Sequence, residues 1–286
     1  RQPYCQNTKP IPQVALLYSN TGYKSEVTTV YNTGDRKQEP MIGVLNALLY
    51  SQLPTEILQE HHLKGRTKEY PLIVIPEWKK IDQQLRAELV EYVQQGGNLL
   101  VIGSETVKIF EKELGVKLNP TTQSIPFWGF DNLISGTKAT YQPFEALTTT
   151  RTFGQWYSQE DKHFTQGAVA SIASLGKGKI AGVYFNFGEQ HFKRGTYVGR
   201  DFISALVLQL FQPQVKVSGS KAINVVLNQK QKSTFVNLIN MTGNHANKAI
   251  HSSDEIPPLY NLRVAVKTPQ RPRQIVLQPE NKSIRS

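Results

Sequence analysis

The sequence predicts an α/β fold with a mainly parallel sheet, followed by a small antiparallel β-sandwich. In the first 213 residues, short apolar segments alternate with amphipathic helical segments, which is typical of a parallel sheet covered on both faces. After Pro213 the apolar residues recur at every second position, which is typical of antiparallel strands. The composition, 39% hydrophobic and 19% charged over 286 residues, is that of a globular chain long enough for two domains.

The parallel part is predicted from four strands and three helices. Each strand is an apolar run that ends at turn-forming residues, and each helix carries apolar residues three and four positions apart. Asp82 is a good N-cap for the second helix, and Gly96-Gly97 ends it. The predicted strands are 13–19, 55–58, 70–76 and 98–103, and the predicted helices are 40–53, 82–95 and 104–114.

Residues 116–165 interrupt this alternation with three prolines and scattered aromatic residues. We expect a loop-rich insertion there, with short antiparallel strands. Strand-like segments return at 168–175 and 179–187, and Gly176-Lys-Gly178 between them predicts a hairpin. A last helix is expected over 200–211.

The remaining residues predict a second domain. Five segments of alternating polarity, with turn residues and no helical segment between them, indicate a small antiparallel β-sandwich. We therefore divide the chain into 1–213 and 214–286, and we expect the second domain to be truncated or to pack on the first. The five segments are 215–217, 222–227, 233–239, 262–267 and 274–277.

The net charge of +11 is concentrated in the second domain. Residues 216–286 hold eleven Lys and Arg against three acidic residues, a net +8, whereas the first 215 residues hold +3. A basic polyanion-binding module is therefore one alternative function, and a solvated basic face is the simpler explanation. No nucleic-acid-binding signature accompanies the charge, so nucleic acid is not expected as a partner.

Cysteine usage and apolar content exclude several classes of protein. Cys5 is the single cysteine, which excludes a disulfide framework, a multi-cysteine zinc site and an iron–sulfur cluster. No run of about 18 apolar residues is present, so no membrane-spanning helix is expected. The sequence begins at Arg1 without a signal peptide, and we expect a processed chain or a fragment that acts in the periplasm or outside the cell.

Several motifs occur in an order that resembles one family of carbohydrate-active enzymes. They are Tyr31-Asn-Thr-Gly-Asp35, the segments 70–76 and 94–103, Leu175-Gly-Lys-Gly-Lys179, and Phe235-Val-Asn-Leu-Ile-Asn240. Together they resemble the region behind the catalytic barrel of glycoside hydrolase family 42 β-galactosidases and related glycoside hydrolases. The resemblance implies a flavodoxin-like, doubly wound domain of the class I glutamine-amidotransferase type, called the trimerisation domain, followed by a small β-sandwich.

The resemblance also implies where amidotransferase chemistry would take place. That family uses a cysteine at a turn between a strand and a helix, and a histidine after a later strand. Here Ser104 or Glu105 occupies the nucleophile region, and residues 183–188 contain no histidine. Because nucleophile and base are both absent, we expect the chain to be catalytically silent.

The enzymatic alternative is a hydrolase whose site lies at the carboxyl edge of the sheet, near Ser19, Glu77, Ser104 and Glu189. Ser104 would be its nucleophile, and His191, expected in a surface loop beyond the strand, would be its base with Glu189 beside it. The simpler explanation is that Ser104 caps the following helix.

Aromatic residues in the insertion suggest a binding site. Trp128 and Trp156 have ring faces that could stack on sugars, and Asp131 and Glu105 are candidate acceptors for hydroxyl groups. The alternative is that these aromatic side chains pack the insertion onto the sheet.

No metal site and no cofactor are expected. His61-His62 lies in a polar loop, where paired histidines are usually solvated, and Asp161 and His163 lack a third ligand. The resulting hypothesis is a non-catalytic structural or interaction module of a carbohydrate-active, glycoside-hydrolase-like protein. Its expected partners are a carbohydrate, and either a missing catalytic barrel domain or further copies of the chain.

Overall fold

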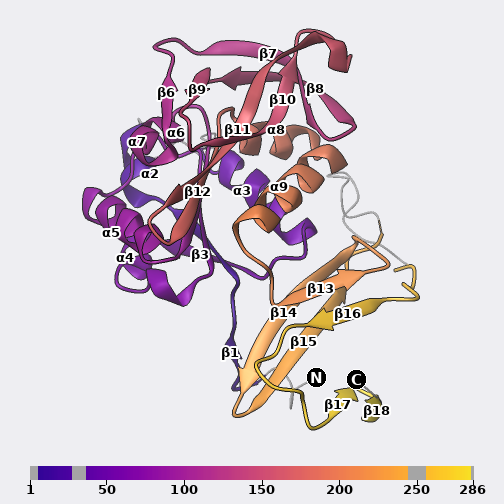
Figure 1. Cartoon of the computed structure of the whole chain (residues 1–286). Coiled ribbons are helices and arrows are strands. Elements are labelled where there is room, and N and C mark those ends of the chain that lie inside the picture. Colours follow the sequence, from indigo (N-terminus) through magenta and orange to yellow (C-terminus); the bar gives the residue numbers. More distant parts are fainter. Residues whose placement is uncertain (1–5, 28–36, 244–255, 285–286) are drawn as a thin grey trace. The chain divides into compact units, whose positions relative to one another are not determined.

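A computed structural model describes residues 6–27, 37–243 and 256–284 (Figure 1). The chain divides into two compact units: Gln13–Gln212, and a second unit in which the described residues up to Pro12 join Pro213–Ser286. The N-terminal residues therefore group with the C-terminal part, whereas the division expected from the sequence places them in the first domain.

The first unit is built on a nine-stranded sheet in the order β3-β2-β4-β5-β12-β11-β10-β7-β8. The strands from β3 to β12 run parallel. The central strands β2, β4 and β5 are buried on both faces, as their continuous apolar sequences require. The parallel strands are β2 (Val14–Tyr18), β3 (Thr55–Gln59), β4 (Leu72–Pro76), β5 (Asn98–Ile102) and β12 (Gly178–Val183).

Helices cover both faces of the parallel part, and the predicted α/β class is confirmed. Three helices pack together on one face, and α5 lies on the other (Figure 1). Asp82 caps α5 as predicted, because its Oδ1 accepts a hydrogen bond from the Leu85 N–H at 2.9 Å. The three helices are α3 (Glu39–Tyr50), α8 (Phe187–Arg194) and α9 (Tyr197–Leu210), and α5 spans Gln83–Gln94. The shorter helices are α2 (Asn20–Glu26), α4 (Glu60–Leu63), η1 (Thr67–Glu69), α6 (Thr106–Ile109), α7 (Glu111–Leu114) and η2 (Lys162–Phe164).

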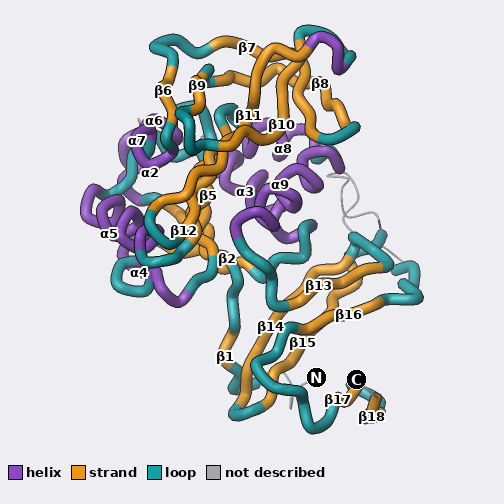
Figure 2. The backbone as a smooth tube through the Cα atoms, in the orientation of Figure 1, coloured by secondary structure: helices purple, strands orange, loops and turns teal. Residues whose placement is uncertain are grey.

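The insertion continues the same sheet as its antiparallel part (Figure 2). The expected loops are instead long strands, so the complete sheet is mixed. Gly176-Lys-Gly178 joins β11 to β12 in an antiparallel hairpin, as predicted. The added strands are β7 (Gln123–Phe130), β8 (Leu133–Tyr141), β10 (Arg151–Tyr157) and β11 (Thr165–Leu175), while β6 (Val116–Leu118) and β9 (Phe144–Ala146) form a separate pair.

The second unit contains small antiparallel sheets. One sheet joins β1 (Lys9–Pro10), β14 (Ile223–Lys230) and β15 (Ser233–Asn240). Two further pairs join β13 (Val215–Ser218) to β16 (Arg263–Val266) and β17 (Ile275–Leu277) to β18 (Lys282–Ile284). The buried core is small and consists of Val215, Val217, Ile223, Val225 and Leu227.

Candidate functional site

The carboxyl ends of the parallel strands meet at one edge of the sheet, which is where ligands bind in open α/β sheets. Polar residues follow the strands directly there. Ser19 comes after β2, Glu60 after β3 and Glu77 after β4, while Gly103 and Ser104 come after β5. These residues define the candidate site.

Glu60 is a buried carboxylate that holds the starts of two helices. Its Oε1 accepts hydrogen bonds from Ser19 Oγ and from the Asp82 N–H, both at 2.8 Å. Its Oε2 accepts from the Thr21 N–H at 3.0 Å and from Thr21 Oγ1 at 2.8 Å. Both carboxylate oxygens are therefore engaged in positioning α2 and α5.

The first residue of the turn after β5 carries no side chain, and Ser104 follows it. Gly103 is the residue directly after the strand, and its φ of 117° favours glycine. A Cβ atom at this position would lie 2.7 Å from Glu77 Cγ and 3.0 Å from Glu77 Cα. Glu77 therefore fills the space that a side chain at position 103 would need.

Glu77 also occupies the N-terminus of α8. Its Oε1 accepts hydrogen bonds from the Gly188 N–H and, at 3.2 Å, from the Glu189 N–H. Burial raises the pKa of Glu77 to about 8, and the two N–H groups offset part of that rise. The backbone of Glu77 has a φ of 29°, and its N–H donates to Ile102 O at 2.7 Å.

Within the part of the chain that the structure describes, no hydrogen bond joins Ser104 to His191. Ser104 is buried and makes no hydrogen bond with the described residues. The expected helix cap by Ser104 is wrong, because the N-cap of α6 is Glu105, whose side chain makes no capping bond. His191 does not lie in a surface loop but is buried within α8, with its ring stacked 5.4 Å from that of Phe187. Burial and then the charge of Arg200 lower the pKa of His191 to about 4, so the ring is neutral at pH 7.

A hollow of about 330 Å³ opens at this edge beside Glu77 and Glu189. Burial acts to raise the pKa of Glu189, but hydrogen bonds from Lys193 and Asn186 lower it below its ordinary value. Glu77 and Glu189 therefore have pKa values shifted in opposite directions. The other lining residues are Glu26, Lys37, Glu39, Pro40 and Trp78.

Sequence reasoning finds the turn after β5 and places Ser19 and Glu77 at the same edge of the sheet, but it does not show the contacts that they make. The signal for Gly103 is a glycine directly after the last apolar residue of a strand. No sequence pattern shows that Glu77, from the neighbouring strand, fills its place, or that Glu60 bridges two helix starts. Both depend on contacts between segments far apart in the chain.

The four candidate binding residues have different environments. Trp128 is only 4% exposed and packs 5.0 Å from both Phe185 and Phe202, so it offers no ring face to a ligand. Trp156 is half-buried, with its ring 6.0 Å from that of Tyr141. Asp131 is exposed in the two-residue turn between β7 and β8. Glu105 lies outside this region, in an ion pair with Lys108 at 2.6 Å.

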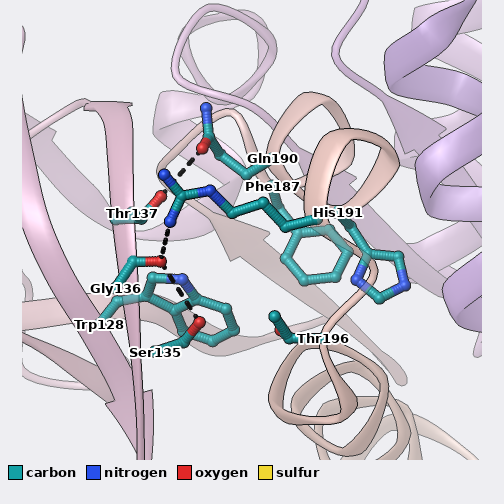
Figure 3. A pocket seen from close by; sticks show the side chains of 9 residues that line it. Trp128, Ser135, Gly136, Thr137, Phe187, Gln190, His191 and Thr196 are labelled. Atoms are coloured by element: carbon teal, nitrogen blue, oxygen red, sulfur yellow. Dashed lines mark hydrogen bonds between the residues drawn. The ribbon is translucent and has the colours of Figure 1, made fainter.

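A second hollow, of about 10 Å³, lies between β8 and α8 (Figure 3). Trp128 and Phe187 are among its lining residues, as are Thr137, Gln190 and Arg194. Thr137 Oγ1 donates to Gln190 Oε1 at 3.1 Å, and Arg194 Nη1 donates to Gly136 O at 2.6 Å. The hollow has room for about one water molecule, so it is not a substrate site.

The part of the chain that the structure describes contains no group of three or more His, Cys, Asp and Glu residues that could hold a metal ion. Asp161 and His163 contact each other at 2.7 Å, and the rings of His61 and His62 lie 3.9 Å apart. Cys5 and the motif at 31–35 lie outside the described residues. Within the described ranges, no helix is long and apolar enough to cross a membrane.

No protein-family model and no curated protein matches the sequence. Solved structures do match the fold. α-L-Fucosidase isoenzyme 2 from Paenibacillus thiaminolyticus aligns with a TM-score of 0.75 and 14% identity, over 99% of this chain and 46% of that enzyme. A catalytic mutant of Gan42B, a GH42 β-galactosidase from G. stearothermophilus, aligns with a TM-score of 0.64 and 14% identity, over 96% and 38%. The cold-adapted β-galactosidase from Rahnella sp. R3 aligns with a TM-score of 0.59 and 13% identity, over 82% and 36%.

These matches confirm the predicted resemblance at the level of fold. The chain is similar to the region outside the barrel of GH42 β-galactosidases and related glycosidases, and it spans less than half the length of each.

Proposed function

We propose that this chain is a non-catalytic structural or interaction module of a glycoside-hydrolase-like protein. The observation that carries the proposal is the turn after β5. Gly103 has no side chain there, and a Cβ atom would lie 2.7 Å from Glu77 Cγ. A nucleophilic side chain at position 103 would have to displace Glu77, whose carboxyl group accepts hydrogen bonds from the first turn of α8.

The matched glycosidases support the module interpretation. Each is more than twice as long as the aligned part, so in those proteins this fold is joined to further domains. A fold can be retained for its surfaces after its chemistry is lost. The module would therefore act by contact with a catalytic domain or with other copies of the chain.

Assays of the purified chain test the absence of catalysis. Neither glutamine, aryl esters nor aryl glycosides should be turned over, and Ser104→Ala should behave like the parent chain. Esterase or glutaminase turnover that disappears in Ser104→Ala would overturn the proposal.

One observation favours a second candidate, a glycoside hydrolase at the carboxyl edge. Glu77 and Glu189 line the same hollow, and their pKa values are shifted up and down respectively. A protonated and an ionised carboxyl group are the pair that glycoside cleavage uses. Against this, Glu189 is bonded by Lys193 and Asn186.

Conservative variants separate the two candidates. If the hollow is catalytic, hydrolysis of an aryl glycoside should be lost in both Glu77→Gln and Glu189→Gln. It should persist in Glu91→Gln, a change of an exposed carboxylate on α5. If the chain is a module, none of the four proteins should show turnover.

A further inference from the structure

β8 is the last strand of the nine-stranded sheet, and one of its sides has no neighbouring strand. The hydrogen-bonding groups of an antiparallel strand point alternately to its two sides. Gly136, Lys138 and Thr140 are alternate residues of β8, and their outward groups would be open to pairing with another strand. Such an open edge is a template for association between chains.

Three side chains of the α8 region bind these groups. Arg194 Nη1 donates to Gly136 O at 2.6 Å, and Gln190 Nε2 donates to Lys138 O at 3.3 Å. Asn186 makes two bonds to Thr140. Its side-chain Oδ1 accepts from the Thr140 N–H at 2.8 Å, and its backbone N–H donates to Thr140 O at 3.2 Å.

The spacing of the two segments explains how one helix can cover a strand edge. The three side chains are four residues apart, a helical rise of about 6.0 Å per step. The three strand groups are two residues apart, about 6.8 Å per step. The mismatch is below about 1 Å per step, so long side chains can meet each group in turn.

Further contacts fix the covering side chains in place. Thr137 Oγ1 donates to Gln190 Oε1 at 3.1 Å, which leaves the Gln190 amide nitrogen directed at the strand. The Asn186 amide nitrogen donates to Glu189 in the same way, which directs its oxygen at Thr140.

We propose that Asn186, Gln190 and Arg194 form an edge guard that prevents β8 from pairing with β8 of a second copy of this chain. A second copy is the partner because its β8 presents the same alternate groups and is present at the concentration of the protein itself. Lys138, exposed on the same strand, adds repulsion between two such strands.

The triple variant Asn186→Ala/Gln190→Ala/Arg194→Ala tests the edge guard. Light scattering after size exclusion, over a range of concentrations, should show that it associates about tenfold or more tightly with itself than the parent chain does. Hydrogen exchange of residues 134–140 should slow as the variant associates. Adding Lys138→Thr should strengthen the association.

A matched control removes two amides and one cation from exposed positions elsewhere: Gln83→Ala/Gln94→Ala/Lys112→Ala. It should associate no more than the parent chain. If the triple variant does not fold, the pair Gln190→Ala/Arg194→Ala keeps the Asn186 bonds to Thr140 and should show the same direction of change. Folded variants that stay as monodisperse as the control, even with Lys138→Thr, would overturn the proposal and leave only a role in attaching α8.

Discussion

At the residue scale, the carboxyl edge of the sheet is occupied by ionisable side chains that hold backbone segments. Glu60 receives hydrogen bonds from the segments after β2 and β4, and Glu77 receives them from the first turn of α8. A buried carboxylate is stable only when it is fully bonded, and its removal leaves several donors without acceptors.

Glu60→Ala should therefore lower the free energy of unfolding by about 3 kcal/mol, because the N–H groups of Thr21 and Asp82 and the Thr21 hydroxyl lose their acceptor. Glu60→Gln should cost less, because one oxygen still accepts. Urea unfolding at pH 7 measures both. Glu91→Ala, an exposed change on α5, is the control, and a Glu60→Ala loss no larger than the control loss would contradict this account.

His191 should make stability fall on acidification. Its pKa is about 4 in the folded chain and about 6.5 when unfolded, so between these values the unfolded chain binds the proton first. The contribution of neutral His191 to the free energy of unfolding is complete above pH 6.5 and decreases as the pH falls towards 4. Between pH 7 and pH 5 the loss should be about 2 kcal/mol.

Glu77 should act in the opposite direction. Its folded pKa of about 8 lies above the ordinary value of 4.5, so its contribution is complete below pH 4.5 and is lost as the pH rises towards 8. When the pH falls from 7 to 5, Glu77 should raise the free energy of unfolding by at most about 2 kcal/mol. This is an upper limit because the side chain is only partly shielded from solvent. The two effects nearly cancel in the parent chain.

Urea unfolding of His191→Gln and Glu77→Gln at pH 5 and pH 7 separates these contributions. His191→Gln should be more stable at pH 5 than at pH 7, and Glu77→Gln should be less stable at pH 5. The same pH dependence in both variants would show that neither group titrates as described.

At the element scale, α3 and α8 approach each other through glycine. A Cβ atom on Gly43 would lie 1.9 Å from Gly188 O, and one on Gly188 would lie 2.2 Å from Pro40 O. Both are backbone atoms, so relief requires the helices to move apart. Since Gly188 N–H also binds Glu77, this close packing positions the candidate site.

Gly43→Ala should lower the free energy of unfolding by about 2 kcal/mol, even though alanine favours a helix by about 1 kcal/mol over glycine. Gly136→Ala is the control, because the nearest atom to its added Cβ would be a Phe127 ring carbon at 3.7 Å. Thermal unfolding compares the two. A Gly43→Ala protein as stable as the parent would mean that the helices separate at little cost.

The same elements show what the sequence can and cannot predict. The predicted strands at 70–76 and 98–103 correspond to β4 and β5. They could be predicted because a short continuous apolar run between turn residues is typical of a buried strand. The antiparallel part was expected to be mostly loops. Pro126 looks like a strand breaker, but it lies at a register shift of β7 between Ile125 and Phe127, where no ladder bond is needed.

The helix α8 was missed for a related reason. Its segment contains Gly188 near the start and few apolar residues, so its helical spacing is weak. Two of its polar side chains, Gln190 and Arg194, bind the edge of β8. Consequently His191 was expected in a loop, although it lies among buried residues of this helix.

At the scale of the whole molecule, the two units differ in the size of their cores. The buried apolar residues of Gln13–Gln212 form one large cluster that spans both faces of the sheet. Among the described residues of the second unit, five apolar side chains are buried in a separate cluster. The second unit also takes β1 and Ile11 from the other end of the sequence, where Ile11 N–H donates to Leu227 O at 2.9 Å.

Residues 13–212 produced alone should therefore unfold cooperatively, whereas residues 213–286 alone should not. The isolated tail lacks β1, so β14 loses one neighbouring strand, and five buried side chains contribute about 10 kcal/mol of burial against the ordering of several dozen residues. Near-ultraviolet circular dichroism and urea unfolding of both fragments make the measurement.

A tail fragment to which residues 6–12 have been joined by a flexible linker should gain structure, since the linker restores the β1–β14 pairing. A cooperative transition in 213–286 without those residues would show that β1 and Ile11 are dispensable.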